Sequence, residues 1–161
     1  MDLDRTHTFL APVAAVAHAM ADPEFYSALR LANVEPPIVL ETSAVGTTLQ
    51  IRVAYQYSGS INPFARSILG TDQFSWEQAL TIDATTGLGT LRIVPAVQPG
   101  AMHCEGTVQL VAIPEGTRRT LTAQLRIRIP LLGGRAERAI APEILKQLDV
   151  EAQALETYLS G

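Results

Sequence analysis

Residues 120–159, TLTAQLRIRIPLLGGRAERAIAPEILKQLDVEAQALETYL, decide the fold of this chain. The stretch predicts a strand that stops at Pro130, a turn on Gly133 and Gly134, and a long helix after the turn. Apolar side chains recur on one side of that helix, at Ile140, Ile144, Leu148, Leu155 and Tyr158. A helix with one apolar stripe needs an apolar partner, and the chain before it offers mainly sheet.

That sheet is predicted by alternating apolar and polar residues. In the strand expected at 48–57, for example, Leu49 and Ile51 alternate with Gln50 and Arg52. Consecutive strands joined by short turns favour an antiparallel meander with one solvated face. The Arg and Glu side chains of the polar face are interpreted as solvated residues and cross-strand pairs. The expected strands are 4–10, 38–43, 48–57, 72–83, 88–94, 102–113 and a last one that ends near 130.

Two short helices are expected between the first and second strands. Pro12 suits the first position of a helix, and Asp22-Pro23-Glu24 combines an N-cap, an N-terminal proline and an acid in the first turn. We expect the second helix to run to about Ala32. Two short helices that meet near residue 22 would close one end of a curved sheet.

The pattern as a whole predicts an α+β fold in one domain, residues 1–161. A curved antiparallel sheet of about seven strands would wrap around the long C-terminal helix and leave an apolar hollow between them. The chain is 161 residues long, with 47% hydrophobic and 17% charged residues. This length can bury a substantial core without disulfides or metals.

Composition excludes several classes of function. The net charge is −4 and the 12 Lys and Arg residues form no basic run, which gives little basis for binding nucleic acid. A single cysteine, Cys104, excludes an intramolecular disulfide and a cysteine cluster for zinc. The three histidines lack metal-ligand spacing, so no metal or cofactor is expected. Without a signal pattern or a long apolar run, the default expectation is a soluble cytoplasmic protein without integral membrane association.

One connection is too long for a hairpin turn. The segment 58–70, SGSINPFARSILG, predicts a short helix with Asn62 as cap and Pro63 at the first helical position. Its apolar residues on one side are Phe64, Ile68 and Leu69. Its apolar side could pack on the sheet edge, or it could cover the mouth of the hollow as a flap.

Three stretches carry a resemblance to a known superfamily: VAYQYSGSINPFARSILG, the tryptophan of QFSWEQAL, and RIRIPLLGGRAERAI. Together with the order of elements, they resemble the helix-grip fold of the START and polyketide-cyclase-like superfamily (SRPBCC), in a bacterial branch classed as a domain of unknown function. The resemblance implies a cavity between sheet and helix for a lipid, sterol, polyketide or other apolar molecule. It implies no particular reaction, because fold does not determine function.

Two polar side chains are predicted on apolar faces. Glu137 falls on the inward stripe of the helix, either as an anchor of the helix start or as a polar contact or acid/base group in the hollow. Gln78 lies between Trp76 and Leu80 on the inner face of its strand, where its amide could bond protein groups or orient a ligand. Pro142 predicts a bend in an otherwise continuous helix.

The sequence assigns no catalytic residue and leaves three functions open. The first is binding or carriage of a small hydrophobic ligand; the second is a cyclase or aromatase activity in which Glu137 and Tyr55 handle protons. The third is a protein-interaction module with a filled core. Ligand identity and oligomeric state are not decided by the sequence. The candidate cavity-lining residues are Tyr55, Phe64, Ile68, Trp76, Gln78, Met102, Glu137, Ile140, Ile144 and Leu148.

Overall fold

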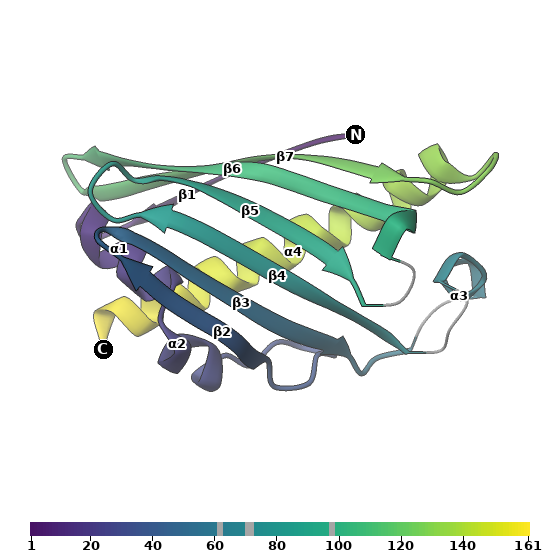
Figure 1. Ribbon diagram of the computed structural model, residues 1–161, viewed down its shortest axis with the longest axis horizontal. Coiled ribbons are helices and arrows are strands. Elements are labelled where there is room, and N and C mark those ends of the chain that lie inside the picture. The colour runs from purple at the N-terminus through teal and green to yellow at the C-terminus, as the bar shows by residue number, and fades with distance from the viewer. Residues whose placement is uncertain (61–62, 70–72, 97–98) are drawn as a thin grey trace.

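The computed structural model describes residues 1–60, 63–69, 73–96 and 99–161, without the side chains of residues 65, 68 and 69. The described residues form one antiparallel seven-stranded sheet in the order β1-β7-β6-β5-β4-β3-β2, with a long helix, α4, crossing behind it (Figure 1). This confirms the predicted helix-grip architecture. The elements are β1 (Asp2–Phe9), α1 (Val13–Met20), α2 (Pro23–Ala28), β2 (Ile38–Val45), β3 (Thr48–Tyr57), α3 (Pro63–Leu69), β4 (Phe74–Asp83), β5 (Leu88–Pro95), a 3-10 turn (Pro99–Ala101), β6 (Met102–Ile113), β7 (Gly116–Ile127) and α4 (Gly133–Ser160).

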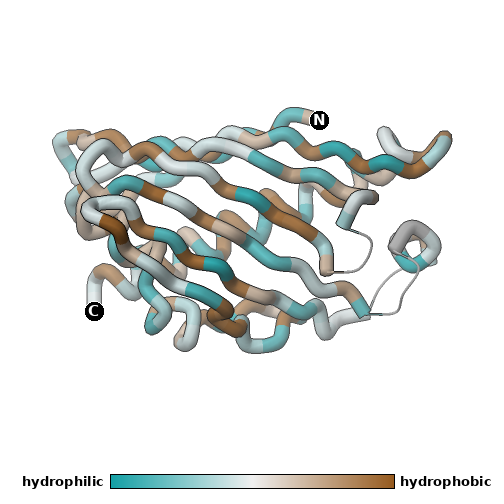
Figure 2. Tube along the Cα trace, in the orientation of Figure 1, coloured by the Kyte–Doolittle hydropathy of each residue, from teal (hydrophilic) through white to brown (hydrophobic). Residues whose placement is uncertain are grey.

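Strands β3, β4, β6 and β7 bury alternate side chains, as predicted, whereas β2 at the sheet edge has no buried residue. In β3, Leu49, Ile51, Val53 and Tyr55 are buried, whereas the residues between them are at least partly exposed. Figure 2 shows the corresponding alternation of hydrophilic and hydrophobic residues along the strands. The buried face of the sheet and the buried side of α4 form one apolar core.

The two short helices close one end of the sheet beside the C-terminal end of α4 (Figure 1). The Asp22 carboxylate accepts a hydrogen bond from the Glu24 N–H at 2.9 Å, which confirms the predicted cap of α2. The ring of Phe25 packs edge-on against that of Tyr158 on α4. The expected end of α2 was wrong: the helix ends at Ala28, because Leu29 adopts extended backbone angles.

The junction between β7 and α4 differs from the prediction. Strand β7 ends at Ile127 rather than Pro130, and the left-handed turn residue is Leu131, with φ of 67°. Gly133 begins the helix instead of forming the turn, and it lies against the end of β7. A Cβ at Gly133 would be 2.4 Å from the Ile127 carbonyl oxygen, so this close approach requires glycine.

Helix α4 continues through Pro142 to Ser160, so the predicted continuous helix is confirmed. Its buried residues are Ala136, Ala141, Leu148, Glu151, Ala152 and Leu155. Across the described part of the chain, no helix combines the length and the apolar character needed to cross a membrane.

Candidate functional site

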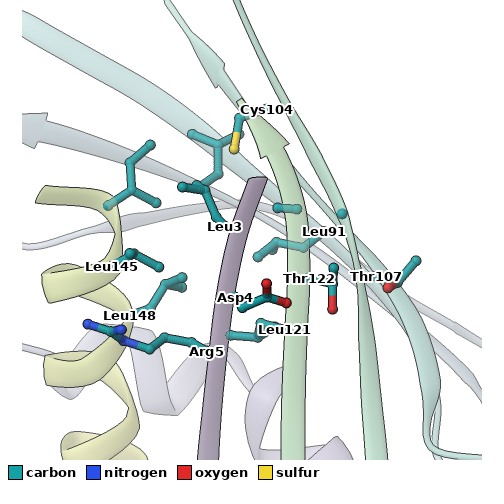
Figure 3. Close-up of a pocket in the computed structure, with 14 residues that line it drawn as sticks. Leu3, Asp4, Arg5, Leu91, Cys104, Thr107, Leu121, Thr122, Leu145 and Leu148 are labelled. Atoms are coloured by element: carbon teal, nitrogen blue, oxygen red, sulfur yellow. The ribbon is translucent and has the colours of Figure 1, made fainter. Parts of the chain in front are cut away.

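Two small cavities lie between the sheet and α4. The first, of about 20 Å³, has walls from β1, β5, β6, β7 and α4 and is largely apolar (Figure 3). The second, of about 30 Å³, has polar side chains among its walls, including Gln78, Arg119 and Glu151. Leu91, Leu121 and Leu148 line both cavities, so the apolar and the polar space are neighbours.

Glu151 is the central polar residue of the second cavity. It projects from the buried side of α4 and is only 7% exposed. Its Oε1 accepts hydrogen bonds from the Tyr55 hydroxyl at 3.0 Å and from the Gln147 amide at 3.1 Å. Burial raises the pKa of the Glu151 carboxyl, and these hydrogen bonds, the Arg119 charge and a smaller contribution from Gln78 oppose the rise.

Arg119 is a buried cation on the inner face of β7. Its guanidinium lies over the Phe9 ring, 5.1 Å from the centroid, and one terminal nitrogen is 3.1 Å from His7 Nδ1. Burial lowers the pKa of Arg119 to about 10, although the Glu151 charge opposes this effect. Among the described residues, no carboxylate lies within ion-pair distance of the Arg119 side chain.

His7 connects this buried cation to the surface. Its Nε2 is 2.9 Å from Asp149 Oδ1, and the same carboxylate accepts from Arg5 Nε at 2.9 Å. Burial lowers the pKa of His7, with the Arg119 charge adding to the effect and the Asp149 hydrogen bond opposing it. Because an arginine can only donate, His7 Nδ1 must accept, and His7 Nε2–H donates to Asp149.

Two buried polar atoms that belong to walls of the second cavity lack a partner. Gln78 Oε1 and Arg119 Nε make no hydrogen bond to any described residue. Gln78 is 6% exposed and Arg119 is 5% exposed, so bulk water does not reach these side chains freely. Buried polar groups in native proteins are nearly always paired, and the unpaired atoms therefore mark a place for a further polar group.

A stack of aromatic rings borders the polar site. The Tyr55 and Trp76 rings are 5.3 Å apart and nearly parallel, and Phe74 stacks on Trp76 at 5.4 Å. Neither Tyr55 nor Trp76 lines one of the two cavities, but the Tyr55 hydroxyl holds Glu151. Burial, followed by the Glu151 charge, raises the pKa of Tyr55, so this hydroxyl remains protonated and donates.

The candidate residues fall into separate groups in the structure. Gln78 lines the second cavity, Ile144 the first, and Leu148 both. Met102 is buried in the core, and Ile140 packs against that core. Phe64 lies under the Arg135 guanidinium at 4.5 Å, which joins α3 to the start of α4. The Ile68 side chain falls outside the described part of the structure.

Glu137 lies away from both cavities. Its Oε1 accepts the Ile127 N–H at 3.0 Å, and its Oε2 is 3.7 Å from the N-terminal ammonium of Met1. The side chain is 15% exposed. The carboxylate thus joins the start of α4 to the end of β7 and to the N-terminus, which is the geometry of a structural anchor.

Two residues of the site were not singled out from the sequence, although the pattern contains them. Glu151 follows Leu148 by three residues and precedes Leu155 by four, which places it on the apolar side of α4. Arg119 has the same parity in β7 as Leu121 and Leu125. The sequence pattern therefore already places one charged residue at an inward position in α4 and another in β7.

Comparison with known proteins agrees with this geometry. The curved sheet around α4 defines an α+β protein of the helix-grip class, with two small cavities between sheet and helix. A family model described as "Protein of unknown function (DUF2505)" matches residues 4–159, and the chain belongs to this family. Uncharacterized proteins of Mycobacterium tuberculosis and Mycobacterium bovis are 33% identical over 77 residues. The match covers 47% of this chain and only 44% of these relatives.

Solved structures share the fold at low sequence identity. A protein of Thermus thermophilus aligns with a TM-score of 0.66 and 18% identity over 99% of this chain and 97% of its own. The Zhui aromatase/cyclase of Streptomyces sp. R1128 aligns with a TM-score of 0.63 and 14% identity, over 99% and 93%. Ara h 8.0201 gives a TM-score of 0.64 and 11% identity, over 99% and 97%. These likenesses confirm the predicted helix-grip fold.

Proposed function

We propose that this protein binds a small, mainly apolar molecule between the sheet and α4. The observation that carries the proposal is the pair of adjoining cavities, one apolar and one with unpartnered polar atoms. Ligand sites commonly combine apolar walls with a few polar groups that fix orientation. The apolar part of the ligand would occupy the first cavity, and its polar group the second.

Ligand entry requires side chains of α4 to move. Cavities of about 20 and 30 Å³ have room for one or two water-sized groups each. Ile144 and Leu145 line the first cavity, are only partly buried, and follow Pro142 closely. Because proline has no N–H to bond the carbonyl of residue 138, this part of α4 lacks one backbone hydrogen bond. We place the opening at this point of the helix.

Native mass spectrometry and the intrinsic fluorescence of Trp76 test the proposal. The purified protein should retain an apolar molecule or bind an added alkylbenzene, and the Trp76 emission should change as the Tyr55–Glu151 neighbourhood adjusts. An Ala123→Leu variant should weaken binding because the larger side chain fills the first cavity. The matched Ala54→Leu variant alters the outer face of β3 and should bind normally. Absence of binding to the unmodified protein would refute the proposal.

A second candidate function is supported by the Tyr55–Glu151 pair. A buried carboxyl with a raised pKa beside a hydroxyl donor can exchange a proton with a bound carbonyl compound. The structurally similar Zhui protein is an aromatase/cyclase. The test is exchange of an α-hydrogen of a bound ketone for solvent deuterium, which Glu151→Gln should abolish. Equal rates of deuterium exchange with wild type and with Glu151→Gln would exclude Glu151 as the base.

A further inference from the structure

We propose that the second cavity recognises a hydroxyl group, so that the interior selects apolar alcohols or phenols over acids and hydrocarbons of similar size. This inference rests on the proposed function and adds the chemistry of the ligand's polar group. It is carried by the two unpartnered atoms, Gln78 Oε1 and Arg119 Nε. One of these atoms accepts a hydrogen bond and the other donates one.

The orientation of the Gln78 amide follows from its neighbour. Gln78 and Glu151 line the same small cavity, and within it the Gln78 Oε1 atom has no hydrogen-bond partner. The NH₂ group is the end of the amide that can donate to a Glu151 carboxylate oxygen, and Oε1 is the end left without a partner. The reversed amide would place two acceptors against each other in a buried site, which is unfavourable.

Arg119 is fixed in a similar way. Its terminal nitrogen donates to His7 Nδ1, and its guanidinium plane rests on Phe9. These contacts hold the side chain from two sides and leave the Nε–H unpaired. A rigid donor and a rigid acceptor thus line one small cavity of about 30 Å³.

A hydroxyl group satisfies both atoms at once, because it accepts from Arg119 Nε–H and donates to Gln78 Oε1. A ketone or an ionised carboxylate only accepts, so each leaves Gln78 Oε1 unpaired. A carboxylate would also bring a second buried acid beside Glu151, and its charge would have to leave water. An ammonium group would lie beside the Arg119 cation and could not accept. The volume suits a group of about the size of one or two waters.

The test compares three ligands that share one apolar body: 4-butylphenol, butylbenzene and 4-butylbenzoic acid. Isothermal titration of the full chain should give binding of the phenol about tenfold tighter than that of either other compound. The factor corresponds to one net hydrogen bond, about 1.4 kcal/mol. Gln78→Leu should reduce the preference to less than about threefold. Gln109→Leu, the same substitution on the outer face of β6, should retain it.

The outcomes separate this inference from the proposed function. If none of the three compounds binds, the proposed function fails and this inference fails with it. If all three bind with similar affinity, the interior is a ligand site but the hydroxyl preference is refuted. Arg119→Met should also remove the preference; if it does not fold, Gln78→Leu alone decides. If Gln78→Leu retains the preference for the phenol, Gln78 Oε1 is not the acceptor of the hydroxyl hydrogen and the proposal is refuted.

Discussion

Two glutamates on α4 have opposite environments. Glu137 bonds a backbone N–H and lies near the N-terminal ammonium, and it is partly open to solvent. Glu151 is enclosed among apolar and aromatic side chains and accepts from Tyr55 and Gln147. Glu137 is therefore a structural contact between α4 and β7. Glu151 is the ionisable carboxyl group of the interior.

Glu137→Gln should lower stability without affecting the interior. The amide oxygen can still accept from Ile127 N–H, but the hydrogen bond loses its charged acceptor and the N-terminal ammonium loses its partner. The difference between a charged and a neutral hydrogen bond predicts a loss of about 1 kcal/mol in the free energy of unfolding. Urea denaturation measures this loss, and ligand titration should show unchanged affinity. Weakened binding with unchanged stability would instead place Glu137 in the ligand site.

Glu151→Gln should change how stability depends on pH. Since the folded pKa of Glu151 is raised above its ordinary 4.5, the folded state holds this proton more tightly than the unfolded state. The resulting contribution is fully present below pH 4.5 and is lost as pH rises through the folded pKa. Relative to wild type, the glutamine variant should therefore gain stability as pH rises from 4.5.

Comparing wild type with the Glu151→Gln variant also separates the pH-dependent contribution of Glu151 to stability from that of His7. The pKa of His7 is lowered, so His7 gives stability that is lost as pH falls below 6.5, opposite in sign to Glu151. Wild type and Glu151→Gln both contain His7, so its contribution cancels in the difference between their free energies of unfolding. Thermal unfolding at several pH values measures that difference. A difference that does not change with pH would contradict the burial of an ionisable group at position 151.

The position of α4 depends on Gly133. Gly133→Ala places a Cβ against the Ile127 carbonyl oxygen, so the start of the helix must shift away from β7. Overpacking of this kind typically costs about 1–3 kcal/mol. The adjacent Gly134→Ala is the matched control, because its Cβ meets only the Arg138 side chain at 3.5 Å.

The two alanine substitutions should therefore have opposite effects on the free energy of unfolding. Gly134→Ala should hold or raise stability by about 0.5–1 kcal/mol, since alanine favours helix over glycine. Equilibrium unfolding of both variants measures the contrast. Equal stability of the two variants would mean that α4 does not depend on this close approach.

The elements were largely predictable because their signals are local. Alternation in β3 and β4, the Asp22 cap and the apolar stripe of α4 each depend on neighbours in sequence. The turn before α4 was not predictable, because Pro130-Leu131-Leu132 contains no residue that favours a left-handed conformation. Leu131 adopts φ of 67° while the helix start is held against β7.

The candidate site was predictable only in part, for a different reason. The inward position of Gln78 follows from strand parity, and the structure places it beside Arg119 and Glu151. Which inward polar residues meet depends on the pairing of β1 with β7 and on the position of α4 across the sheet. A single sequence does not give these long-range contacts. It also cannot give the size of the cavities, which depends on how all side chains pack.

The fold as a whole places an amphipathic interior beneath one helix. The sheet supplies Gln78 and Arg119, α4 supplies Glu151, and the shared leucines separate the polar space from the apolar one. We propose that this interior, and no outer surface, receives the ligand. A ligand that spans both cavities would have to displace the leucines that line both, among them Leu148.

Methyl-detected NMR of the protein with 4-butylphenol shows which side chains the ligand contacts. Our account predicts intermolecular nuclear Overhauser effects from the ligand's butyl protons to the methyl groups of Ile144, Leu145 and Leu148, which line the first cavity. It also predicts a shift of the Trp76 indole signal as the neighbouring ring of Tyr55 adjusts. Contacts confined to exposed methyl groups such as those of Ile38 and Val45 on β2, with the interior leucines unchanged, would contradict it.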